Sequence, residues 1–435
     1  MASRRAVNRR KASDGTSMNR TTSVPMQQVS SPAFAARAAG ITGSVIDSSS
    51  ALLQRRREPT ISFAMGCPAA DAIPSALIAG LAAEVLRDPA AESLNYGPTE
   101  GEVSLRRALI DFLRQAGNAI TDDRLLITAG GTQGLDLVAK LFIDPGDLVI
   151  AEQPSYTNGT AIVTGYQGLI LRCPTDNAGM QVECLPELIE ATGKIPKVAY
   201  VIPNSQNPGG TTLSLTRRKL LLDLAERYGF LILEDDPYGL LYFDKPPPES
   251  LLSLDRGRGK VIAVHTFSKI LSPGLRVGWV VAPPVVIDRM IAAKQGLDTC
   301  ANPLGQRIIA GFLGGGHMGR HLAELRAAYR LRRDAMLTAL SGSFAGLQGT
   351  SWTTPDGGFF VWVELPGGLS TDALFPVALE AGVAFIPGSA FVEPGGPGNA
   401  MRLCFANSTP AEISEGVRRL RRAVDVVMNR ETLRP

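Results

Sequence analysis

The sequence predicts an α/β protein whose larger part is a mostly parallel, doubly wound sheet covered by helices, and whose smaller part is α+β. From residue 125 onward, short apolar runs alternate with amphipathic segments, which indicates strands alternating with helices. The runs are continuously apolar, as is typical of strands buried on both faces of a parallel sheet. Near Arg326 the pattern changes to a long charged helix followed by more widely spaced strands. That change predicts the second, smaller domain.

The elements of the larger part follow in order. A strand at 125–128 leads through Gly130-Gly131 into a helix at 132–142. A second helix carries an apolar stripe around Leu224 and ends at Gly229, a residue that favours helix termination. Further apolar runs predict four strands, at 198–202, 230–233, 261–264 and 277–281.

The smaller part is expected to contain the long helix near Arg326, a strand at 359–364, another helix and a strand at 401–405. The predicted domain limits are therefore 91–325 for the large domain and 326–435 for the small one. Residues 36–90 form an N-terminal arm before them, and residues 1–35 form a tail.

Composition excludes several classes of protein. With 435 residues, 45% of them apolar and 20% charged, the chain is not wholly disordered, collagen-like or a coiled coil. A net charge of +3 provides no general attraction to nucleic acid or membrane, so we expect neither partner. No apolar run qualifies as a membrane span. Five scattered cysteines without a CxxC pair indicate no disulfide framework. His317 and His321 have no acid or cysteine to complete a site, so no metal is expected.

The tail differs from the rest of the chain. Residues 1–35 are rich in Ser, Thr and Arg and poor in apolar residues, which predicts disorder. Because ten Lys or Arg but three Asp or Glu fall within residues 1–60, the remainder is slightly acidic. We expect a cytoplasmic protein; the alternative is an organellar one, with the tail as a transit peptide.

Polar residues follow four of the expected strands, at the end where doubly wound sheets bind ligands. After the first lies Gly130-Gly131-Thr132-Gln133, a turn into a helix whose backbone N–H groups can bind an anion. After the second lies a polar turn with Asn207, whose amide can donate to a ring oxygen. Each turn also fits ordinary loop geometry.

The next two strand ends carry charges. A carboxylate at Asp235, beside an apolar run, needs a cationic partner unless it serves as a helix cap. Lys269 follows the next strand, where desolvation would lower its pKa and make its amine a nucleophile or base. Arg276 adds a fixed positive charge seven residues later.

Together these groups describe one ligand, pyridoxal 5′-phosphate, which has a phosphate, a basic ring nitrogen, a ring hydroxyl and an aldehyde. The expected contacts are the phosphate with Gly131, Thr132, Gln133, Thr266, Ser268 and Arg276; the nitrogen with Asp235; the hydroxyl with Asn207 and Tyr238; and the aldehyde with Lys269.

From about residue 36 to the end the chain contains, in order, SFAMGCPAADAIP, LNYGPTEGEVSLRRAL, TAGGTQGLDL, EQPSYTNG, IPNSQNPGG, LEDDPYG, HTFSKILSPGLRVGW, GGFFVWVELP and MRLCFANSTPAEISEGVRRL. In these motifs it resembles the fold-type I pyridoxal-phosphate aminotransferases, in the branch of 2-aminoadipate and kynurenine aminotransferases. That branch also supplies the effector domains of MocR-type regulators.

The resemblance implies roles at the cofactor. Lys269 would bond the aldehyde and shuttle the proton, Asp235 would face the ring nitrogen, and Tyr238 would contact the ring hydroxyl; these three are the catalytic candidates. Asn207 would contact the cofactor and the substrate, and Tyr156 would stack on the ring.

The resemblance also implies substrate and partner contacts. Arg402 would clamp the substrate α-carboxylate, with a structural salt bridge as the alternative. Gly66 would touch the substrate from a closing segment. Tyr96 would reach the cofactor across the interface of a homodimer with shared active sites, with turn packing as the alternative.

The implied reaction is ping-pong transfer of an amino group from an L-amino acid to a 2-oxo acid. Alternatives are elimination, decarboxylation or oxidation on the same scaffold, and a MocR-like amino-acid sensor, for which the tail is too short and polar to supply a winged helix. Gly209 replaces the usual Thr of its motif, and Met65 and Cys67 replace the usual Gly and Leu beside Gly66. The substrate side chain is therefore not predicted.

Overall fold

A computed structural model describes residues 33–41, 43, 59–88, 92–115, 117, 120–393, 395–396 and 398–432. The chain divides into two compact units, residues 1–36 and residues 37–435. The predicted disordered tail therefore lies, from residue 1 to 32, outside the described residues.

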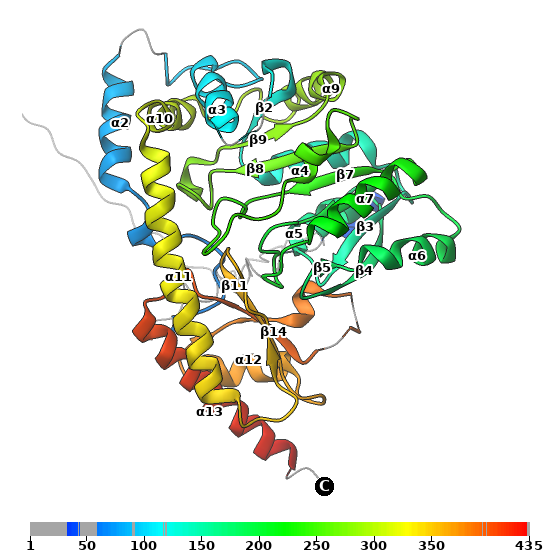
Figure 1. Ribbon diagram of the computed structural model, residues 1–435, viewed down its shortest axis with the longest axis vertical. Coiled ribbons are helices and arrows are strands. Elements are labelled where there is room, and N and C mark those ends of the chain that lie inside the picture. The colour runs from blue at the N-terminus through cyan, green and yellow to red at the C-terminus, as the bar shows by residue number, and fades with distance from the viewer. Residues whose placement is uncertain are drawn as a thin grey trace, which may run out of the picture. The chain divides into compact units, whose positions relative to one another are not determined.

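The large sheet confirms the expected mostly parallel architecture (Figure 1). Its strand order within the described residues is β2-β9-β8-β7-β6-β3-β4-β5. The central strands from β8 to β4 are parallel to one another, whereas β9 is antiparallel to both of its neighbours and β5 is antiparallel to β4. The strands are β2 (Leu125–Thr128), β3 (Leu148–Gln153), β4 (Leu169–Asp176), β5 (Gly179–Met180), β6 (Val198–Val201), β7 (Leu231–Asp235), β8 (Val261–Thr266) and β9 (Gly278–Val281).

Helices cover both faces of this sheet because successive residues of its strands alternate between two apolar layers. On β3, for example, Val149 and Ala151 pack with one layer and Ile150 with the other. One layer is closed by α4 (Gly131–Phe142), α5 (Thr157–Gly165) and α9 (Pro284–Gln295), and the other by α6 (Leu185–Thr192), α7 (Leu215–Tyr228) and α8 (Leu251–Asp255).

A third apolar cluster covers the β2-β9-β8 end of the sheet and continues into the smaller part of the molecule. Its helices are α2 (Ser75–Arg87), α3 (Val103–Gln115), α10 (Pro303–Gly314), α11 (His317–Phe344), α12 (Thr371–Glu380) and α13 (Pro410–Thr432). The long helix expected near Arg326 is α11, which begins nine residues earlier and contacts both α10 and α13 (Figure 1).

The smaller part is α+β, as expected. Its antiparallel sheet has the order β10-β11-β14-β13 in the described residues. These strands are β10 (Ser351–Trp352), β11 (Phe360–Glu364), β13 (Ile386–Pro387) and β14 (Ala400–Cys404). The exact domain limits proposed from the sequence stay a prediction.

Residues 61–72, here called the N-terminal strap, are held by the C-terminal half of the chain. In the strap, β1 (Ile61–Ser62) pairs in parallel with β12 (Val383–Ala384). Phe63 donates its N–H to Ala384 and accepts from the N–H of Cys404 through its carbonyl, both at 2.8 Å. The strap therefore lies against β14, the strand that carries Arg402.

In the large sheet, three strands were not expected from the sequence: β3, β4 and β5. Strand β4 is exposed or half-buried at most of its positions, so it has no continuous apolar run to reveal it. The run at 277–281 did predict β9, but this strand is antiparallel although it is fully buried. Burial on two faces therefore identified the strand without fixing its direction.

Candidate active site

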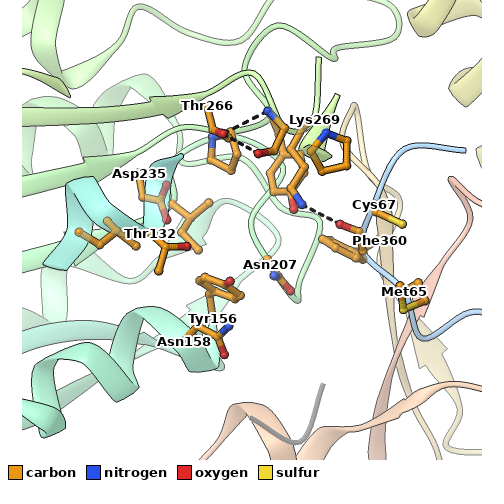
Figure 2. Close-up of a pocket in the computed structure, with 18 of the residues that line it drawn as sticks. Met65, Cys67, Thr132, Tyr156, Asn158, Asn207, Asp235, Thr266, Lys269 and Phe360 are labelled. Atoms are coloured by element: carbon orange, nitrogen blue, oxygen red, sulfur yellow. Dashed lines mark hydrogen bonds between the residues drawn. The ribbon is translucent and has the colours of Figure 1, made fainter. Parts of the chain in front are cut away.

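A cavity of about 270 Å³ lies where the carboxyl ends of the parallel strands meet the strap and the small sheet (Figure 2). Twelve of the fourteen predicted site residues line it. They are Gly66, Gly131, Thr132, Tyr156, Asn207, Asp235, Tyr238, Thr266, Ser268, Lys269, Arg276 and Arg402. Gln133 and Tyr96 are not among the lining residues.

One end of the cavity is built to bind an anion. Helix α4 begins there at Gly131, preceded by Gly130 at φ 85°, a conformation that favours glycine. A Cβ on Gly130 would lie 2.8 Å from Nη2 of Arg276, so the glycine lets the guanidinium lie against the turn. The hydroxyls of Thr266 and Ser268, 2.9 Å apart, add donors on the same side of the cavity. All but one of the residues expected at the phosphate line this cavity.

The exception is Gln133, which braces the turn from outside the cavity. Its Oε1 accepts from the N–H of Ala129 at 2.8 Å, and its Nε2 donates to Oδ2 of Asp298 at 2.8 Å. The other oxygen of Asp298 accepts from Nζ of Lys294 at 2.9 Å, and the Lys294 side chain is fully buried. We call Lys294, Asp298 and Gln133 the turn brace. No sequence pattern indicates this brace, because Asp298 lies 165 residues from Gln133.

At the centre of the sheet, Asp235 is the last residue of β7 and is buried. Burial raises the pKa of its carboxyl to about 7, while a hydrogen bond from Tyr200 acts in the opposite direction. The Tyr200 hydroxyl donates to Oδ2 of Asp235 over 2.9 Å. Sequence reasoning missed Tyr200 because it stands inside an apolar strand and looks like a core residue.

Lys269 lies three residues beyond β8, and its Nζ donates to the carbonyl of Gly66 in the strap over 2.8 Å (Figure 2). Burial lowers the pKa of this amine, as the sequence led us to expect. The side chain therefore has a larger neutral fraction than an exposed lysine, which is the form that acts as a nucleophile or base.

Arg402 reaches the cavity from β14 and is 1% exposed. Its Nη1 donates to Oδ1 of Asn207 at 3.0 Å and its Nη2 to the Ala64 carbonyl at 2.6 Å. Its guanidinium lies 4.3 Å from the ring centre of Phe360, a cation–π contact. Among the described residues Arg402 forms no ion pair, so the structural salt bridge considered above is not formed. Its buried Nε has no hydrogen-bond partner among the described residues, which suits it to a ligand carboxylate.

The tyrosines differ in their surroundings. Tyr238 is buried edge-on against Phe359 and Phe360, and burial holds the pKa of its hydroxyl well above the usual range. Tyr156 lines the cavity just before α5. Tyr96 is 82% exposed, away from the cavity of its own chain.

These groups fit pyridoxal 5′-phosphate. The anion end would hold the phosphate, Asp235 would face the ring nitrogen, and Lys269 would supply an amine for the aldehyde. The unpartnered Nε of Arg402 remains for the carboxylate of a substrate. No described helix is both long enough and apolar enough to cross a membrane, and no cluster of three metal-binding side chains occurs in the same residues.

Several lining residues were not predicted from the sequence, among them Asn158 and Phe360. Asn158 lies in the first turn of α5, directly beyond β3, a strand that the apolar pattern did not reveal. Phe360 belongs to an apolar strand and gave no sign of facing a cavity. Met65 and Cys67, the substitutions noted beside Gly66, both line the cavity (Figure 2).

Comparison with known proteins gives a consistent result. A family model described as aminotransferase class I and II matches residues 61–420. The chain is 39% identical to aromatic-amino-acid aminotransferase 1 of Thermococcus litoralis over 374 residues, which cover 85% of this chain and 89% of that protein. It is also 39% identical to the 2-aminoadipate transaminase of Thermus thermophilus over 376 residues, 86% of this chain and 92% of that one.

A solved structure agrees with these relatives. The crystal structure of kynurenine aminotransferase from Pyrococcus horikoshii, in complex with PMP, its substrate KYN and its product KYA, superimposes with a TM-score of 0.84 at 37% identity. The match covers 92% of this chain and 98% of that one. The fold of this chain is therefore shared with proteins named as aminotransferases.

Proposed function

This chain belongs to the class I and II aminotransferase family, and from that premise we propose how its residues divide the work of a pyridoxal-phosphate-dependent aminotransferase. The observation that carries the assignment of roles is the meeting of three features in one cavity: a half-buried amine, a buried carboxylate and an anion-binding turn. The enzyme moves the amino group of an amino acid to a 2-oxo acid.

The cofactor, when bound, supplies a ring that accepts the electrons of the bond broken at the substrate Cα. Lys269 would hold the cofactor through its amine and move the proton of the substrate Cα, a task for which its lowered pKa suits it. Asp235 would keep the ring nitrogen protonated. Asn207 and Tyr238 would orient the ring through its hydroxyl.

Arg402 would bind the α-carboxylate of the substrate through its Nε, which has no partner in the part of the chain that the structure describes. In the structure its Nη2 is held by the carbonyl of Ala64 and Lys269 is held by that of Gly66, both in the strap. The two cations that would act on the substrate are therefore positioned by one segment.

The proposed donors are amino acids with neutral, apolar or aromatic side chains. Apart from Lys269, Arg276 and Arg402, the described residues that line the cavity carry no cation to pair with a second carboxylate. The strap presents Met65 and Cys67, and the small sheet presents the ring of Phe360. The relative from Thermococcus litoralis, which is named for aromatic amino acids, supports this choice.

We further propose a homodimer, in which Tyr96 of each chain would reach the cofactor in the other chain's cavity, and a cytoplasmic location. The exposure of Tyr96 supports this role. We place the large cofactor-binding domain at 91–325, the small domain at 326–435, and the arm that contains the strap at 36–90.

A single-turnover experiment tests the central assignment. The purified enzyme, loaded with pyridoxal phosphate, is mixed with L-phenylalanine, L-leucine, L-glutamate or L-2-aminoadipate, and conversion of the cofactor is followed by absorbance. We expect phenylalanine and leucine to react at least about 10-fold faster than the two acidic donors, since an unpaired carboxylate in the cavity costs at least this much.

The variant Lys269→Ala should lower the rate with every donor by at least about 1000-fold. Lys219→Ala, which removes an exposed lysine on α7, is the control and should behave as wild type. A Lys269→Ala enzyme that reacts at the wild-type rate would contradict the assignment. Faster reaction with acidic donors would contradict the proposed substrate class alone.

A further inference from the structure

Tyr200 reaches Asp235 because of the register of the sheet. It lies in β6, and its backbone neighbours are Ala151 on β3 and Leu233 on β7. Asp235 stands two residues beyond Leu233 and therefore on the same face of the sheet. A tyrosine side chain is long enough to reach such a diagonal neighbour. The resulting hydrogen bond, 2.9 Å long, is buried beneath the cavity.

The space for this hydroxyl depends on a glycine. Gly159 lies buried within α5, and a Cβ at this position would be 2.4 Å from the Tyr200 hydroxyl oxygen and 2.6 Å from the ring carbon that bears it. Glycine is among the poorest residues for a helix interior. Helix α5 thus contains glycine, a residue unfavourable for helix stability, at a position where any larger side chain would clash with the Tyr200 hydroxyl.

The burial of Asp235 makes the hydrogen bond from the Tyr200 hydroxyl important for the charge of the carboxyl group. A buried carboxylate is more easily protonated than an exposed one, and a neutral carboxyl group cannot keep a ring nitrogen charged. A hydroxyl that donates to one oxygen favours the ionised form and fixes the plane of the group. In the structure the Tyr200 bond counteracts the effect of burial on the Asp235 pKa.

We propose that Tyr200 is a positioning residue of the reaction: its hydroxyl holds Asp235 ionised and oriented toward the ring nitrogen of the cofactor. The inference rests on the proposed role of Asp235. It assigns to the reaction a residue that touches neither the substrate nor the cofactor and does not line the cavity.

The test compares Tyr200→Phe with wild type on two cofactors: pyridoxal phosphate, and its 1-deaza analogue, in which carbon replaces the ring nitrogen. Dissociation constants are measured by titrating the apoenzyme, and single-turnover rates are measured with L-phenylalanine. The matched control is Tyr166→Phe, which removes a hydroxyl that donates to Oδ1 of Asp136 over 3.1 Å, outside the residues that line the cavity.

With pyridoxal phosphate, Tyr200→Phe should lower the single-turnover rate by about 10- to 100-fold, the effect of losing one hydrogen bond to a charged group. It should also bind the cofactor more weakly than wild type. With the 1-deaza analogue, Tyr200→Phe and wild type should have equal dissociation constants and equal rates, because no ring nitrogen is present for Asp235 to act on. Tyr166→Phe should match wild type with both cofactors.

Two results would overturn the proposal. One is a Tyr200→Phe enzyme equal to wild type with pyridoxal phosphate. The other is the same loss with both cofactors, which would assign Tyr200 a structural role; thermal unfolding of the apoenzyme would then show a matching loss of stability. Neither result bears on Lys269, whose variant tests the proposed function separately.

Discussion

Glu152, at the end of β3, is a buried carboxylic acid with no place in the proposed reaction. It is 1% exposed, and its Oε2 accepts from the N–H of Ile202 and from Nε2 of Gln206. Burial is the largest influence on this group and raises its pKa to about 8. Its ordinary value is 4.5, so the folded chain keeps a proton here that the unfolded chain releases.

A pH dependence of stability follows. The folded state binds more protons than the unfolded state between pH 4.5 and 8, so Glu152 lowers the free energy of unfolding as the pH rises through that window. Glu152→Gln stays neutral and keeps an oxygen that accepts both hydrogen bonds. From pH 5 to pH 8 the apoenzyme of this variant should therefore lose about 2–4 kcal/mol less stability than wild type.

Urea unfolding of the apoenzyme at pH 5, 6.5 and 8 measures this difference, and the exposed Glu187→Gln on α6 serves as the control. A stability difference between Glu152→Gln and wild type that stays constant across these pH values would mean that Glu152 is ionised in the folded protein at neutral pH.

At the scale of elements, the junction between β2 and α4 depends on residues outside the cavity. Ala129 precedes the helix, and its N–H is held by Gln133, the first member of the turn brace. Because Lys294 is fully buried and paired with Asp298, the brace connects the turn to the segment after α9. The turn at Ala129 is therefore linked through Gln133 to the Lys294–Asp298 pair.

Gln133→Ala should weaken binding of pyridoxal phosphate to the apoenzyme by about 10-fold, the effect of losing one to two hydrogen bonds. It should leave the affinity for pyridoxal, which lacks the phosphate, unchanged. Asp298→Ala should produce the same pattern although Asp298 does not line the cavity. The exposed Gln115→Ala is the control.

Equal weakening for pyridoxal and pyridoxal phosphate would instead mean that the brace supports the fold as a whole. A loss in Gln133→Ala without one in Asp298→Ala would favour the sequence-based expectation that Gln133 binds the phosphate itself.

Some strands of the large sheet could be predicted from the sequence and others could not. Strands β2, β7 and β8 were predicted because each contains a continuous apolar run. Strand β3 was not predicted. For that reason the sequence did not show that Tyr156 and Asn158 follow a strand of the sheet and line the cavity. Apolar patterns report burial, but they do not report which strands are adjacent.

The same property of apolar patterns explains why some residues of the site were predicted from the sequence and others were not. Lys269 and Asp235 stood out because charged residues are unexpected beside apolar strands. Tyr200 and Phe360 did not, because aromatic residues inside strands are ordinary core residues. Their roles depend on strand order and register, which bring Tyr200 to Asp235 across 35 positions of sequence.

At the scale of the whole molecule, the proposed homodimer has a direct test in mixed dimers. Coexpression of Lys269→Ala and Tyr96→Ala chains yields hybrids in which, if Tyr96 serves the partner, one site contains both Lys269 and Tyr96. Such a hybrid should have about half the wild-type activity per dimer, as one of its two sites is intact. Each variant homodimer should be much less active.

Purified hybrids, separated by two different affinity tags, are assayed by single turnover with L-phenylalanine. A hybrid no more active than the Tyr96→Ala homodimer would place Tyr96 in the site of its own chain or outside the reaction.

The strap has a consequence for synthesis. Residues 61–63 obtain their backbone hydrogen bonds from residues 382–404, more than 300 positions later in the chain. Contacts between such distant segments form late, since a long loop must close first. During synthesis on the ribosome, the strap can therefore form its hydrogen bonds to β12 and β14 only after these strands have been translated. The carbonyl of Gly66 reaches its final place beside Lys269 only after nearly the whole chain has been translated. A nascent enzyme truncated before residue 382 would contain both Lys269 and the strap but lack the strands that hold the strap.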